Sequence, residues 1–108
     1  MDIINSEIFL QRGTTGNLNI EIEMDELGTL YERTEGDGLI FEIKKRPDPD
    51  IEAIISIEVS GLYLIIRPED TIDLPSGDYF YEIKLTTNNG DVYKSHFMPF
   101  HLTNTVTR

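Results

Sequence analysis

Two histidines and a serine near the carboxyl end are the first candidates for chemistry. His96 and His101 stand five positions apart in a segment of strand character. Their side chains should therefore point to opposite faces, and they cannot bind one metal ion together. Ser95 directly precedes His96, and adjacent strand residues also face opposite ways, so this pair is a poor nucleophile and base. We expect both histidines to be surface or edge residues.

A proline-rich acidic loop is the second candidate. Asp48, Asp50 and Glu52 alternate along it and offer the oxygen ligands that Ca²⁺ prefers. The 12-residue EF-hand pattern is absent, because position six counted from Asp48 is Ala53 rather than glycine and position twelve is Val59 rather than glutamate. We interpret the loop as a solvated acidic segment, and we predict neither a metal site nor a cofactor.

The usual sequence patterns of enzymes are missing. Without cysteine the chain has no thiolate nucleophile, no disulfide and no sulfur-ligated metal. It contains no G-x-S-x-G motif, and the glycine-rich segments "RGTTG" and "EGDG" lack the Lys-Ser/Thr pair and the helix of a phosphate loop. Twenty acidic residues place carboxylates side by side by chance, and no tryptophan is present to line a sugar cleft. We therefore predict that the chain is not an enzyme, and we assign no catalytic residue.

Composition and charge narrow the possible partners. Twenty Asp and Glu against nine Lys and Arg give a net charge of −11. This argues against nucleic acid, whose binding depends on basic side chains that replace condensed counterions. No apolar run approaches the ~20 residues that cross a bilayer, and the start has neither a basic leader nor a cleavage site. With 108 residues, 39% of them hydrophobic, we expect one folded domain over residues 1–108, made in the cytosol.

Strict alternation of apolar and polar residues predicts strands throughout the chain. It is clearest over residues 18–24 and 79–85. Further strands are predicted at 7–12, 29–34, 39–45, 53–59, 62–67 and 91–103, each bounded by Gly, Asn, Asp or Pro. About eight short strands with dense turn signals indicate an all-β, antiparallel β-sandwich. The residues expected in its core are Leu18, Ile20, Ile22, Phe41, Ile43, Tyr79, Tyr81, Ile83, Leu85 and Phe100. Only residues 46–57 leave room for a helical turn.

The segment "LPSGDYFY" has the features of a corner leading into a long strand. Pro75 suits the second position of a type I turn and Gly77 the fourth. A tyrosine soon after such a turn is typical of the tyrosine corner of immunoglobulin-like sandwiches, in which the ring packs inside and its hydroxyl bonds backbone upstream. Tyr79 and Tyr81 both fit this role.

A terminal hairpin should follow this strand. Residues 89–90, Asn-Gly, suit a two-residue type I′ turn. That loop pairs Tyr81 with Met98 on the inner face, but it also places Leu85 opposite Lys94. The second pair is unfavourable, so we predict a bulge or a partly exposed end.

The last predicted strand carries more apolar residues than one domain can bury. Tyr93, Phe97 and Met98 lie in it with only Lys94 and Pro99 to guard a sheet edge. Outward-facing Tyr93 and Phe97 would form the kind of apolar patch that marks an interface. We assign Tyr93, Phe97 and Met98 as candidate interface residues and expect the chain to form a homo-oligomer or to assemble on a partner.

Three segments carry a resemblance to a known family: "FLQRGTTGNLNI", "IIRPEDTIDLPSGDYFYEIKLTTNNGDVY" and "FHLTNTVTR". The chain resembles the short immunoglobulin-like proteins of phage and prophage tail or baseplate gene clusters, and is similar to baseplate upper protein amino-terminal domains. It departs from their pattern at Thr14 and Thr105, where Asp is usual. The resemblance implies an immunoglobulin-like sandwich in a virion, assembled in the host bacterial cytoplasm, that contacts copies of itself or neighbouring tail proteins and has no catalytic residues.

A small module that binds carbohydrate or a cell-surface ligand is the alternative function. Sandwiches commonly present loops or exposed aromatic rings for such binding. Phe80, Tyr93 and Phe97 are the aromatic residues that would face outward and stack on sugar rings.

Overall fold

The structure, a computed structural model, describes residues 1–4, 7–20, 36–59 and 63–104. Nine strands and one short helix are present in this part of the chain. They are β1 (Asp2–Ile4), β2 (Glu7–Gln11), β3 (Gly16–Asn19), β4 (Gly38–Lys44), β5 (Ile55–Glu58), β6 (Tyr63–Ile66), α1 (Pro68–Thr71), β7 (Gly77–Thr86), β8 (Val92–Lys94) and β9 (Met98–Thr103). The predicted strand 29–34 and the end of the predicted strand 18–24 lie outside the described residues.

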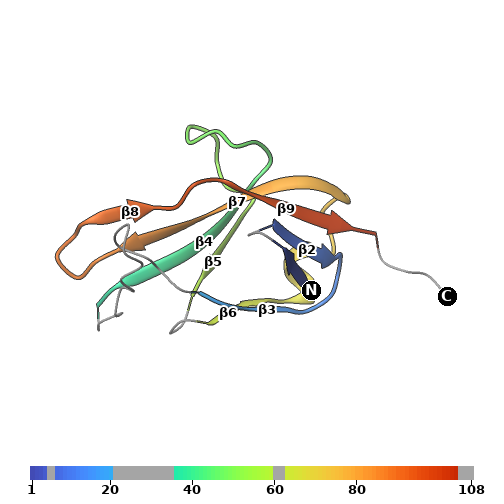
Figure 1. The fold of residues 1–108 in the computed structure, drawn as a ribbon, viewed down its shortest axis with the longest axis horizontal. Helices are drawn as coiled ribbons and strands as arrows, with labels where there is room; N and C mark the ends of the chain where they lie inside the picture. Colours follow the sequence, from blue (N-terminus) through green and yellow to red (C-terminus); the bar gives the residue numbers. More distant parts are fainter. Residues whose placement is uncertain (5–6, 21–35, 60–62, 105–108) are drawn as a thin grey trace.

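A seven-stranded sheet forms most of the fold. Its strand order is β1-β2-β9-β7-β4-β5, and β8 pairs with β7 beyond the start of β9 (Figure 1). The sheet is mixed, because β2 pairs with β9 in parallel while the other neighbours are antiparallel. The prediction of an antiparallel fold was therefore wrong for this pair. Alternation shows which face of a strand is buried, and it contains no information about which strand lies alongside.

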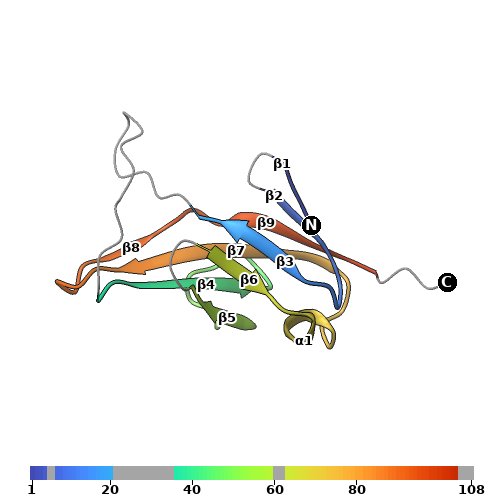
Figure 2. The same ribbon diagram turned by 90° about the horizontal axis from the view of Figure 1, so that it is seen from below.

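A second, two-stranded sheet covers one face of the large sheet. It consists of β3 and β6 in antiparallel register, with Leu18 opposite Leu64. Figure 2 shows these two strands lying across the larger sheet. Leu64 and Ile66 belong to the same buried cluster as Phe41 and Phe100 of the large sheet. The molecule is thus mostly β, with two sheets that share one hydrophobic core.

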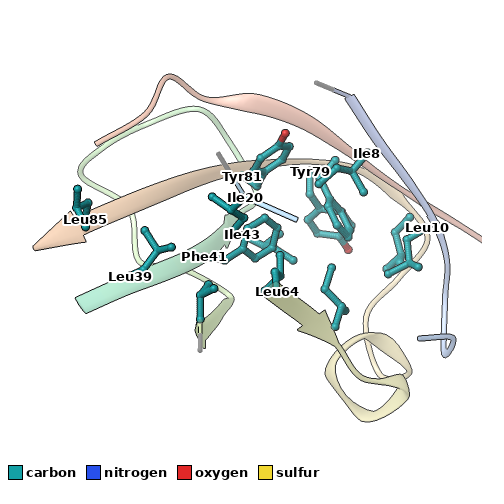
Figure 3. Close-up of a cluster of buried hydrophobic side chains, with 14 residues drawn as sticks. Ile8, Leu10, Ile20, Leu39, Phe41, Ile43, Leu64, Tyr79, Tyr81 and Leu85 are labelled. Carbon is teal, nitrogen blue, oxygen red and sulfur yellow. The ribbon is translucent and has the colours of Figure 1, made fainter. Parts of the chain in front are cut away.

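Most of the predicted core residues are buried in this cluster. Ile20, Phe41, Ile43, Tyr79, Tyr81, Leu85 and Phe100 are buried, Leu18 and Ile83 pack against the cluster partly buried, and Ile22 lies outside the described residues. The ring of Phe41 lies 5.2 Å from that of Tyr81 and 6.4 Å from that of Phe100, measured between centroids. Figure 3 shows Phe41, Tyr79 and Leu64 pointing toward one another between the sheets.

The helix begins at Pro68, directly after the predicted strand 62–67, where sequence analysis predicted no helix. Pro68 occupies the start of α1, where its fixed φ suits a helix and its missing N–H costs no hydrogen bond. The Asp70 carboxylate accepts a hydrogen bond of 2.8 Å from the Arg67 N–H and completes the cap. The helical turn considered for residues 46–57 is absent. The hydrogen-bonded turn that follows α1 closes at Leu74, whose N–H donates to Thr71, earlier than the predicted turn at 74–77.

The β7–β8 hairpin has a three-residue loop rather than the predicted two-residue turn. The Gly90 N–H donates to the Thr87 carbonyl at 2.9 Å, and the Thr87 N–H donates to the Asp91 carbonyl at 2.8 Å. Gly90 has φ +91°, a left-handed conformation that glycine adopts without steric cost. The extra loop residue shifts the register by one position, so that Leu85 faces Tyr93 and the unfavourable pair with Lys94 does not form.

The predicted bulge is confirmed, and it compensates for this shift. The Ser95 N–H donates to the Ile83 carbonyl at 2.9 Å, and the Ile83 N–H donates to the Ser95 Oγ at 2.8 Å. Two residues before Ile83 on β7, Tyr81 faces Met98 as predicted. Three residues of the returning chain therefore lie opposite two residues of β7, which is the definition of a bulge.

Candidate functional site

The three candidate interface residues do not lie on one surface. Tyr93 lies on β8 and is 47% exposed. Met98 faces Tyr81 and packs partly buried against the core. Phe97 is half-buried, with the Lys44 ammonium 5.5 Å from its ring centroid. Tyr93 and its neighbour Val92, which is 53% exposed, therefore form the apolar part of the accessible surface in this segment.

Strand β8 presents an open sheet edge. It pairs with β7, and no other strand in the described part of the chain lies beside it (Figure 1). The Asp91 carbonyl accepts a hydrogen bond from the N–H of Thr87, the residue that follows β7, and the Ser95 N–H donates to the Ile83 carbonyl of β7. Because alternate residues of an antiparallel strand bond to the same neighbour, the N–H and C=O groups of Val92 and Lys94 point away from β7. We call these four backbone groups the hairpin edge, and all three residues of β8 are exposed.

Phe97 covers a buried ion pair on the face of the large sheet opposite the core. The Lys44 Nζ lies 3.3 Å from the Glu82 Oε1, and the two side chains are only 5% and 3% exposed. The same ammonium donates to the Pro49 carbonyl at 3.4 Å. Phe97 is thus committed in part to packing within the chain. Phe97 faces outward as expected, and sequence analysis missed this contact because only the pairing of β4 with β7 brings Lys44 close to Glu82.

His101 lies between two carboxylates rather than at a simple surface position. Its Nδ1 is 2.7 Å from the Asp78 Oδ1, and its Nε2 is 3.1 Å from the Glu7 Oε1. The ring of Phe9 stacks on the imidazole at 4.5 Å between centroids. These contacts join β2, β9 and β7 on the outer face of the sheet. The hydrogen bond to Asp78, followed by that to Glu7, raises the pKa of His101 above its ordinary 6.5.

The His101 cluster, His101 with Glu7, Asp78 and Phe9, was hidden from sequence analysis. Glu7 and His101 are 94 positions apart, and the parallel pairing of β2 with β9 brings them together. The carboxylates contact different ring nitrogens, so the arrangement is that of a protonated imidazole donating to both sides. His96 is exposed and takes no part in the cluster.

The other chemical candidates have structural roles. The Asp48 carboxylate accepts a hydrogen bond of 2.9 Å from the Asp50 N–H and so stabilises its own loop. The Ser95 hydroxyl donates to the carbonyl of His96 and accepts from the Ile83 N–H, and the His96 imidazole is not its partner. Across the described ranges, no three His, Asp or Glu side chains are grouped so that they would hold a metal ion. In the same ranges, helical structure never reaches the length and apolar character of a membrane-spanning helix.

The chain matches no protein-family model and no curated protein sequence.

Proposed function

We propose that this chain is a non-enzymatic structural or adaptor component of a phage or prophage tail or baseplate. It would have an immunoglobulin-like sandwich fold and act through contacts with copies of itself, with neighbouring tail proteins, or with both. The observation that carries the proposal is the hairpin edge, an open strand with Val92 and Tyr93 exposed beside it. The chain would be assembled into virions in the host bacterial cytoplasm.

The energetics of an open edge support a contact function. Unpaired backbone groups next to exposed apolar side chains favour strand pairing with another chain, and monomeric proteins usually protect such edges. The net charge of −11 opposes indiscriminate association of copies. An edge that can pair with a strand, on a chain whose copies repel one another, suits a specific partner. Assembly into a virion would supply such a partner.

Sedimentation equilibrium tests this proposal. We expect self-association at tens of micromolar, or co-sedimentation with a neighbouring tail protein, and we expect Tyr93→Asp to abolish either one. Tyr63→Asp is the matched control, because Tyr63 is a 66% exposed tyrosine on the other sheet. Phe97→Asp is less informative, since it would place a carboxylate next to the Lys44–Glu82 pair and disturb the fold. The proposal would be contradicted if the chain were a strict monomer at low and high salt and bound none of the proteins encoded by neighbouring genes.

A second candidate function, carbohydrate or cell-surface binding, is favoured by a different surface. On the outer side of the small sheet, Tyr63 faces Asn19 across the strands and Ile65 faces Asn17, and all four residues are exposed. An open aromatic ring flanked by amides is suited to stacking on a sugar and bonding its hydroxyls. Phe80 and Phe97, which sequence analysis proposed for this role, are half-buried. A sugar that raises the melting temperature of the parent chain but not of Tyr63→Ala would support this function.

A further inference from the structure

We propose that the hairpin edge receives an extended acidic segment of a partner protein as an added β-strand, with an Asp or Glu of that segment opposite Lys94. This inference rests on the proposed contact function and specifies the chemistry of the partner. It depends on two observations: the outward backbone groups of β8 and an unusual pair of lysines.

Lys84 and Lys94 lie directly opposite each other on β7 and β8. Like charges at directly opposed positions of an antiparallel pair destabilise it. The ion pairs of the described residues involve Lys44 and His101, and neither Lys84 nor Lys94 has a carboxylate partner there. A chain with only nine Lys and Arg thus places two of them directly opposite each other, and no carboxylate in the described ranges forms an ion pair with either. An acidic side chain from outside would supply it.

Protection of the edge does not explain both lysines. A lysine on an edge strand discourages unwanted pairing, and this accounts for Lys94 alone. Lys84 lies on β7, an interior strand with β4 on one side and β8 on the other, so it protects no edge. Its position opposite Lys94 concentrates positive charge on one face of the hairpin. Charges more than about 8 Å away are largely screened at physiological salt, so these two lysines contribute strongly to the charge that an approaching strand meets at this edge.

A second copy of the chain fits the hairpin edge less well than an acidic partner. Antiparallel pairing of two β8 strands centred on Tyr93 would place Lys94 opposite Val92 of the second copy and leave both lysines without a counter-charge. A three-residue strand also buries far less than the ~1,200 Å² of a stable interface. We therefore favour a different protein that makes further contacts elsewhere.

The geometry specifies a short pattern in the partner. In antiparallel addition, which is slightly more stable per residue than parallel addition, the partner reads acidic, apolar, apolar opposite Lys94, Tyr93 and Val92 in turn. The acidic and last apolar side chains lie on the lysine face, and the middle one lies on the Tyr93 face. The acidic residue belongs opposite Lys94 and not opposite Val92. Asp91 directly precedes Val92, so an acidic residue at that end of the partner strand would meet a like charge.

The test is a titration of the full chain, labelled with ¹⁵N, with two capped heptapeptides. One is Thr-Thr-Glu-Val-Val-Thr-Thr, and the control has Lys in place of Glu. We expect the amide signals of Val92 and Lys94 to shift, and the Glu peptide to bind about tenfold more tightly than the Lys peptide, with a preference that weakens in high salt. Lys94→Glu should reverse the preference, and Lys84→Glu should reduce it.

Several results would overturn the inference: equal binding of both peptides, shifts confined to other surfaces, or no binding of either. If Tyr93→Asp abolishes a salt-favoured self-association while neither peptide binds, the occupant is a second copy; the contact function then stands and the acidic partner does not. If the Glu peptide binds as expected but the chain associates with no tail protein, the acidic strand site stands and the virion role fails.

Discussion

The hydroxyl of Tyr79 donates a hydrogen bond of 2.7 Å to the carbonyl oxygen of Pro75, four residues earlier in the chain. Tyr79 is 6% exposed, and Pro75 lies in the segment that leads from α1 into β7. The bond ties this segment to the interior of the large sheet. Tyr79 thus makes the bond to upstream backbone that sequence analysis expected of one of the two tyrosines in "YFY".

Tyr79→Phe should lower the free energy of unfolding by about 1 kcal/mol, because it removes this part-buried hydrogen bond from a buried ring. Tyr93→Phe is the control, since it removes the hydroxyl of an exposed ring and should change stability by no more than about 0.5 kcal/mol. Urea unfolding measures both variants. Equal costs would show that the corner bond contributes nothing.

Lys94→Glu should stabilise the fold, by a few tenths to about 1 kcal/mol, because it replaces a pair of opposed lysines with an ion pair to Lys84. Lys45→Glu makes the same change of net charge at an exposed position after β4 and should not stabilise. If Lys94→Glu makes the fold more stable but no longer binds the Glu peptide, Lys94 is a residue kept for binding. Destabilisation by Lys94→Glu would mean that the two lysines do not repel each other.

Removing one member of the Lys44–Glu82 pair should cost about 3–5 kcal/mol, because the other charge would stay buried without its partner. Among the described residues no group donates a hydrogen bond to the Glu82 Oε1, so the nearby Lys44 ammonium is the charge that compensates it. Glu82→Leu and Lys44→Met test the single losses by thermal or urea unfolding. The double variant should recover most of the loss, since it leaves no charge behind, and single and double losses that simply add would contradict the coupling.

The His101 cluster should make stability depend on pH. Because the folded pKa is raised above the unfolded value of about 6.5, the protonated cluster contributes its full stabilisation below that pH and loses it as the pH rises through the folded pKa. The free energy of unfolding, measured relative to His101→Gln, should therefore fall over this window.

An NMR titration of the His101 ring is the direct measurement. Asp78→Asn and Glu7→Gln should each lower its pKa, and the Asp78 change should have the larger effect. Glu58→Gln, which removes a carboxylate on β5 outside the cluster, serves as the control for net charge. A His101 pKa that does not respond to either cluster variant would show that the contacts do not persist in solution.

Much of the fold could be predicted from alternation alone. Strand side chains have a period of two, so the sequence determined that Phe41, Ile43, Tyr81 and Leu85 face the core. The same reasoning found the pair of Tyr81 with Met98 and predicted a bulge or a partly exposed end, because a continuous ladder would have placed Leu85 opposite a lysine. The predicted core and bulge follow from local pattern and side-chain chemistry.

Only the tertiary structure decided which strands and which polar groups are neighbours. The parallel pairing of β2 with β9 joins the two ends of the described chain, and it creates the contact of Glu7 with His101 that no spacing in the sequence indicates. A single additional loop residue at the hairpin moved Lys94 from Leu85 to Lys84. Each strand's own period determines the face of a side chain. Its partner across the ladder depends on register and strand order, which are set by loop length and by packing of the whole core.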